Sequence, residues 1–66
     1  MKNGILGEDE GYDVLVNGTI RTFSDDEAGS FEIARELKKR NPGCIVEIRL
    51  RRTGARVVMG KDGRIL

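Results

Sequence analysis

Residues 24–43 read SDDEAGSFEIARELKKRNPG, a stretch that predicts one helix with marked ends. Ser24 and Glu27 have the S-x-x-E spacing of a capping box, in which each side chain bonds the backbone N–H of the other residue. Acidic residues follow the cap and basic residues precede the N-P-G at 41–43, as the helix dipole favours, and the proline and glycine then stop the helix. We therefore expect a helix over residues 25–40.

One side of this helix is apolar. At 100° per residue, four apolar side chains fall on a single stripe with a serine inside it. They are Phe31, Ile33, Ala34 and Leu37, with Ser30 among them. The stripe predicts that the helix packs on a sheet, and the small serine lets it lie close. Phe23 and Ala28, on either side of the cap, are expected to form a hydrophobic staple.

Two strand-forming segments precede the helix. Residues 12–16 and 19–23 are rich in β-branched and aromatic side chains. Asn17-Gly18 separates them, and Asn-Gly between such segments is the strongest short-range signal for a β-hairpin. The sequence therefore predicts a hairpin that leads directly into the helix.

Two registers are open for this hairpin. A two-residue turn places Leu15 opposite Ile20, whereas a three-residue loop places Val14 opposite Ile20 and Asp13 opposite Arg21. We favour the three-residue loop because it gathers apolar side chains on one face of the hairpin and leaves an ion pair on the other.

A second hairpin is expected after the helix. Residues 44–52 alternate apolar with charged side chains, which predicts a third strand, and Thr53-Gly54 marks a turn. A two-residue loop there pairs Leu50 with Val57, so that the apolar sets of both strands share a face. The same register pairs Ile48 with Met59, Arg49 with Val58 and Arg51 with Arg56. After a further D-G turn, residues 64–66 are expected to pair briefly as a last strand.

The predicted fold class is α+β with the element order ββαββ. One helix covers one face of a four-stranded, mainly antiparallel sheet. The strand order 2-1-3-4 is favoured because parallel strands usually need cover on both faces. Residues 11–66 would form this single domain, and residues 1–10 a flexible acidic arm. The uncovered face is expected to carry Asp13, Leu15, Arg21, Glu47, Arg49, Arg51, Arg56 and Val58.

Composition narrows the classes of function. The chain of 66 residues has no histidine, the commonest acid–base group, and its one cysteine, Cys44, cannot form an intrachain disulfide. No catalytic, metal-binding or cofactor-binding residue is predicted, and we do not expect an enzyme. No apolar run approaches the roughly 20 residues of a membrane span, so the expectation is a cytoplasmic protein without membrane partners.

Charge is unevenly divided along the chain. Residues 1–32 hold two basic and eight acidic residues, a net of −6, and residues 33–66 hold ten and three, a net of +7. Arginines dominate the second hairpin, and arginine forks suit phosphate groups, while β-ribbons can enter a major groove. The hairpin is therefore a candidate nucleic-acid surface. A solvated strand face whose charges protect the sheet edge explains the same pattern.

Three segments carry a resemblance: residues 22–28, residues 34–37 and the ending Gly60-Lys61-Asp62-Gly63-Arg64-Ile65. Together they are similar to a family of short, uncharacterised bacterial and phage-associated proteins that end in G-[KR]-D-G-[KR]-I. The likeness covers roughly residues 12–66, but this chain has an extra segment at 49–57 and Tyr12 in place of a tryptophan. The family has no established activity, so the resemblance implies no site residues. Residues 18–28 also resemble the arm-binding domains of tyrosine recombinases, which implies DNA binding.

These observations predict a small non-enzymatic interaction domain, homodimeric through its open sheet face or an edge strand. The alternative is a nucleic-acid-binding domain that uses the arginine-rich second hairpin, with Lys38, Lys39 and Arg40 nearby. The candidate contact residues for either partner are Arg49, Arg51, Arg52, Arg56, Leu15 and Val58.

Overall fold

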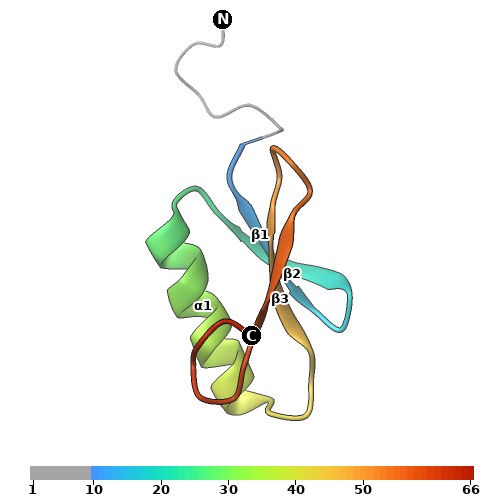
Figure 1. Cartoon of the computed structure of the whole chain (residues 1–66), viewed down its shortest axis with the longest axis vertical. Coiled ribbons are helices and arrows are strands. Elements are labelled where there is room, and N and C mark those ends of the chain that lie inside the picture. The colour runs from blue at the N-terminus through green and yellow to red at the C-terminus, as the bar shows by residue number, and fades with distance from the viewer. Residues whose placement is uncertain (1–9) are drawn as a thin grey trace, which may run out of the picture.

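The computed structural model describes residues 10–66, which form four strands and one helix. These are β1 (Tyr12–Val16), β2 (Thr19–Ser24), α1 (Glu27–Arg40), β3 (Val46–Leu50) and β4 (Arg56–Met59). The strands form one antiparallel sheet in the order β2-β1-β3-β4, which confirms the predicted α+β class and strand order. Figure 1 shows α1 along one side of the sheet and the tips of the two hairpins pointing in different directions. Residues 1–9 of the predicted acidic arm lie outside the described residues.

The core lies between α1 and one face of the sheet. Its buried side chains come from three strands and the helix: Val14, Val46, Ile48, Met59 and Ala34. The predicted apolar stripe of α1 is confirmed, because Phe31, Ile33 and Leu37 pack against this cluster. Ser30 is fully buried within the stripe and its hydroxyl donates to Glu27 O at 2.7 Å, which satisfies the polar group at the helix–sheet contact.

The start of α1 differs from the prediction. Ser24 is the last residue of β2, and Asp26 is the N-cap, with φ −135° and ψ 155°. The Ser24 hydroxyl donates to Asp26 O at 3.0 Å instead of forming a capping box. Because Gly29 has no side chain, the polar atoms of Ser24 and Asp26 fill the space where a Cβ would lie. The pairing of Ser24 with Tyr12 in the sheet therefore takes precedence over the local capping signal.

The predicted hydrophobic staple is also wrong. Phe23 pairs with Asp13 and so lies on the face of the sheet away from α1, while Ala28 is exposed. The predicted end of the helix is confirmed at Arg40. There Asn41 N donates to Leu37 O at 2.9 Å, and Lys38 Nζ donates to Cys44 O at 2.6 Å in the following loop.

The first hairpin adopts the register that we did not favour. Asn17 and Gly18 both have positive φ, 52° and 86°, as a two-residue type I′ turn requires. Leu15 therefore lies opposite Ile20, and the three-residue loop is wrong. The ladder then shifts by one residue, so that Arg21 is an exposed bulge with no residue opposite it. Turns of this type match the twist of the strands, which favours the tight turn over an ion pair at Asp13 and Arg21.

The second hairpin is shifted by two residues from its predicted register. Arg49 pairs with Arg56 and Ile48 with Val57, so the pairing of Arg51 with Arg56 is wrong. The loop spans residues 51–54, and Gly54 N donates to Leu50 O at 2.7 Å to close it. A shift of two residues keeps every side chain on its predicted face, because strands alternate with a period of two.

The chain ends along the outer edge of β4. Ile65 forms an isolated bridge with Met59, and Leu66 N donates to Val58 O at 2.8 Å. The predicted last strand is therefore present as one bridge. Arg35 of α1 donates to Gly63 O at 3.3 Å and ties this return to the helix. Among residues 10–66, no helix has the length and apolar character that a membrane span requires.

A carboxylate and arginine cluster as candidate functional site

The open face is the side of the sheet away from α1, and its side chains form two rows across the four strands. One row runs Ile20, Leu15, Glu47, Val58, and the other runs Phe23, Asp13, Arg49, Arg56. Cross-strand neighbours in such rows are close enough to interact directly. Each row therefore begins at an apolar residue of β2. The first row contains one charged residue, Glu47, and the second contains three, Asp13, Arg49 and Arg56.

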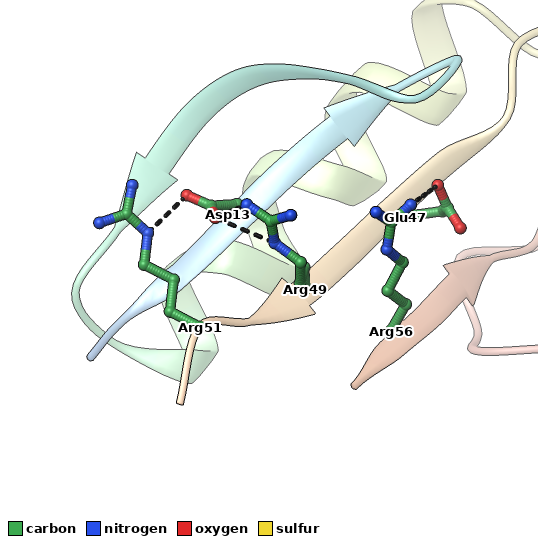
Figure 2. Close-up of polar contacts among 5 residues, drawn as sticks. All are labelled: Asp13, Glu47, Arg49, Arg51 and Arg56. Carbon is green, nitrogen blue, oxygen red and sulfur yellow. Dashed lines mark hydrogen bonds and ion pairs between the residues drawn. The ribbon is translucent and has the colours of Figure 1, made fainter. Parts of the chain in front are cut away.

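Asp13 is the centre of this face. It belongs to β1, one of the two central strands of the sheet, and is completely buried, at 0 % exposure. Arg49 donates to its Oδ2 from Nη2 at 2.7 Å and from Nε at 3.3 Å, and Arg51 Nε donates to Oδ1 at 2.9 Å. Figure 2 shows the two guanidinium groups converging on the carboxylate from β3 and the loop that follows it. A buried charge is expensive unless it is paired and bonded, and both carboxylate oxygens meet this condition here.

Arg51 also lies over an aromatic ring. Its Cζ is 4.6 Å from the centroid of Phe23, within the range of a cation–π contact. The Phe23 ring occupies the space where Gly11, the residue before β1, would carry a Cβ. Phe23 is thus fixed by Gly11 and Arg51, yet remains 41 % exposed.

The other two candidate arginines are paired with carboxylates as well. Arg56 Nη1 lies 3.4 Å from Glu47 Oε1, as drawn in Figure 2. Arg52 Nη2 lies 3.7 Å from Glu10 Oε2, and both of these side chains are largely exposed. Exposed ion pairs contribute little stability, about 1 kcal/mol at most. The pairing still means that all four candidate arginines have an acidic neighbour within the chain.

The structure brings five of the six predicted contact residues to the open face or its edge and leaves Arg52 apart, beside Glu10. Leu15 is buried beneath the open face at 1 % exposure, Val58 is half-buried at the β4 side, and Arg52 lies in the hairpin loop. The sequence predicted Asp13 on the uncovered face, but neither Asp13 nor Phe23 was among the predicted contact residues, although both organise the cluster. An acidic residue inside the apolar run YDVLV of a central strand was the available signal, because such a residue needs charged partners.

The cluster offers little to a substrate. The Asp13 carboxylate is bonded to arginines through both oxygens and is not accessible to solvent. No three side chains of histidine, cysteine, aspartate or glutamate gather as metal ligands in the part of the chain that the structure describes. The chemistry of this face is therefore that of an internally neutralised salt-bridge network flanked by apolar side chains.

Comparisons with known proteins return no significant match to a protein-family model, to a curated protein or to a solved structure. The resemblance to the G-[KR]-D-G-[KR]-I family stays a prediction, and so does the fainter one to arm-binding domains.

Proposed function

We propose that this chain is a non-enzymatic protein-interaction domain whose docking element is the outer edge of β2. The observation that carries the proposal is a six-residue edge strand that has no neighbour on its outer side within residues 10–66. An extended segment of another protein can add to such an edge as a further strand, with backbone hydrogen bonds supplying affinity. The opposite edge, at β4, is occupied near Val58 and Met59 by the C-terminal return.

The backbone hydrogen bonds of β1 show which N–H and C=O groups of β2 point away from the sheet. Arg51 N donates to Gly11 O at 3.1 Å and Asn17 N donates to Ile45 O at 2.8 Å, so odd-numbered residues of β1 bond toward β3. In antiparallel ladders this direction alternates along the strand. Even-numbered residues of β1 therefore bond toward β2, where their partners are Thr19, Thr22 and Ser24. Ile20 and Phe23 lie between these partners and direct their own N–H and C=O groups outward.

The side chains at the same two positions support docking. Ile20 is 48 % exposed and Phe23 is 41 % exposed, and both lie on the open face. Covering them removes apolar surface from water at about 25 cal/mol per Å². The β2 edge thus combines outward backbone groups with apolar side chains at the same residues.

The four arginines give no comparable support to nucleic-acid binding. The guanidinium groups of Arg49 and Arg51 are bonded to the buried Asp13 carboxylate, so a phosphate contact that drew either group away would leave that charge less well paired. Leaving a buried charge unpaired costs several kcal/mol, which a single phosphate contact does not offset.

A display library of random seven-residue peptides tests the proposed function. We expect selected peptides to be extended, and their addition to ¹⁵N-labelled protein to shift the amide resonances of Ile20 and Phe23. Ile20→Pro should abolish binding because proline removes an outward N–H from the edge, whereas Ile45→Lys, a change at another exposed apolar residue, should not. Peptides whose shifts map to α1 or to the β4 side would contradict the proposal.

A further inference from the structure

We infer that a second copy of this chain occupies the β2 edge, running antiparallel, with Ile20 of one protomer opposite Phe23 of the partner subunit. This inference rests on the proposed function, because it assigns the partner at that same edge. Two separate features of β2 support it: the backbone groups at its outer edge and the side chains on its open face each match those of a second copy.

The backbone part concerns hydrogen-bonded pairs. Ile20 and Phe23 are the β2 residues whose N–H and C=O groups point outward, as the alternation along β1 requires. In an antiparallel pairing, residues with outward groups must lie opposite each other to exchange both bonds. Placing Ile20 opposite Phe23 of the partner subunit meets this condition twice, once on each side of a two-fold axis. Because both copies contain the extra residue Arg21, each strand has the same two residues between Ile20 and Phe23, and the two pairs can form at the same time.

The side-chain part concerns the faces of the sheet. Residues three apart in a regular strand point to opposite faces, because the period is two. The bulge at Arg21 changes this, so that Ile20 and Phe23 both lie on the open face, opposite Leu15 and Asp13. A two-fold axis perpendicular to the sheet keeps the open faces of both copies on the same side. Each exposed isoleucine then covers an exposed phenylalanine, and the aromatic–aliphatic pair is a favourable cross-strand contact.

Such a pairing joins two four-stranded sheets into one continuous sheet with both helices on the same face. The interface is isologous, as in most homodimers, because the same segment serves both partners. A different protein would need its own strand with apolar residues at matching positions, whereas a second copy provides them by symmetry. Arg21 lies next to the axis, opposite Thr22 of the partner subunit and diagonal to the partner's Arg21, so repulsion between the two arginines opposes the pairing and limits its strength.

Light scattering during size-exclusion chromatography, over a range of concentrations, tests the pairing with the whole chain. We expect the mass to rise toward twice that of one chain as concentration increases. Ile20→Lys should raise the dissociation constant about tenfold or more, because each copy loses an apolar contact and gains a charge. Ile45→Lys is the matched control, since it adds the same charge at a residue that is 56 % exposed. Ile45 precedes β3 and lies across β1 from the outer edge of β2, so the change should leave the constant unchanged.

Disulfide crosslinking tests the register. In a Cys44→Ser background, a mixture of Ile20→Cys and Phe23→Cys proteins should crosslink on oxidation, because the two positions lie opposite each other within disulfide reach. Either protein alone should not, because identical positions are separated by about 10 Å along the strands. Far-UV circular dichroism of each variant, compared with the unsubstituted chain, establishes that the variants fold.

The outcomes separate the two proposals. A monomeric mass at concentrations up to about 1 mM, the weak end of the affinity scale, overturns the homodimer. Crosslinking of either variant alone, or a dimer that Ile45→Lys disrupts, overturns the register. If the chain is monomeric but seven-residue peptides still bind along β2, the proposed function stands with a different protein as its partner. If neither association occurs, both proposals fail.

Discussion

Asp13 is the residue on which the open face depends. A carboxylate at 0 % exposure in a central strand would be strongly destabilising alone, yet three short bonds from Arg49 and Arg51 satisfy both of its oxygens. The arginines themselves keep about a third of their side-chain surface exposed, so their own loss of hydration is incomplete. Burial of Asp13 therefore strengthens its attraction to the two arginines, while the arginines lose only part of their hydration free energy.

Asp13→Asn should destabilise the fold substantially. The amide removes the negative charge to which two guanidinium groups are bonded, at a cost of about 3 kcal/mol. A chain of 66 residues has roughly 3–10 kcal/mol of total stability, so this loss should be obvious in a urea denaturation midpoint.

Glu47→Gln is the control for this prediction. The pair of Glu47 and Arg56 is partly exposed, so its loss should cost less than about 1 kcal/mol. Equal destabilisation by the two substitutions would show that burial of Asp13 does not set the strength of its ion pairs.

At this scale, the sequence predicted most residues of the open face but not their burial, and it was wrong about Ile20, which lies on the open face opposite Leu15 and not opposite Val14. Leu15, Arg49 and Val58 lie on the predicted face because a shift of two residues preserves alternation. Arg51 reaches Asp13 from the loop after β3. Burial of Asp13 could not be predicted, because it depends on arginines 36 and 38 residues away in the chain.

Turn geometry decides both hairpins at the scale of elements. Asn17-Gly18 accommodates two consecutive residues of positive φ and sets Leu15 opposite Ile20, and the bulge at Arg21 then brings Phe23 opposite Asp13. Gly54, with φ 80°, likewise closes the four-residue loop of the second hairpin. Each turn therefore acts on the open face through the register it imposes.

Gly18→Ala should weaken the fold by about 1 kcal/mol, because a Cβ is disfavoured at φ 86° although no atom obstructs it. Thermal unfolding followed by circular dichroism measures the change. Gly43→Ala is the matched control, since its Cβ also meets nothing within 4 Å and its φ lies outside the left-handed region. A fall in midpoint no greater than that of Gly43→Ala would contradict the conformational explanation.

The elements and their order followed from local signals, whereas the registers did not. Apolar alternation and the N-P-G stop located the strands and the end of α1. The start of α1 was placed two residues too early because Ser24 pairs with Tyr12, a contact distant in sequence. The second hairpin was predicted with too short a loop. Its longer loop accompanies the bond from Arg51 N to Gly11 O, which extends the pairing of β1 with β3.

For the molecule as a whole, the two oppositely charged halves of the chain neutralise each other on folding. Asp13 and Glu10 of the acidic half bind Arg49, Arg51 and Arg52 of the basic half. The arginine-rich hairpin therefore presents much less positive charge than its sequence indicates, and long-range attraction for a polyanion is correspondingly weak.

We expect no arginine-dependent binding of the protein to generic duplex DNA or single-stranded RNA. Fluorescence anisotropy at low salt, where phosphate contacts are strongest, measures it. Arg52→Gln and Arg56→Gln change the more exposed members of the set and should leave any residual signal unaltered. Binding that falls steeply with salt and is lost in these variants would instead favour the nucleic-acid alternative.

The C-terminal return along β4 has a consequence for assembly. Sheets with two available edges can add copies without end, and this is the route to fibres. Here Ile65 and Leu66 already occupy the outer side of Met59 and Val58, so growth from β4 is obstructed. Association through β2 then uses the edge that is open within residues 10–66 of each copy and closes on itself. The bonds of Ile65 and Leu66 to β4 would thus limit an associating sheet to two copies.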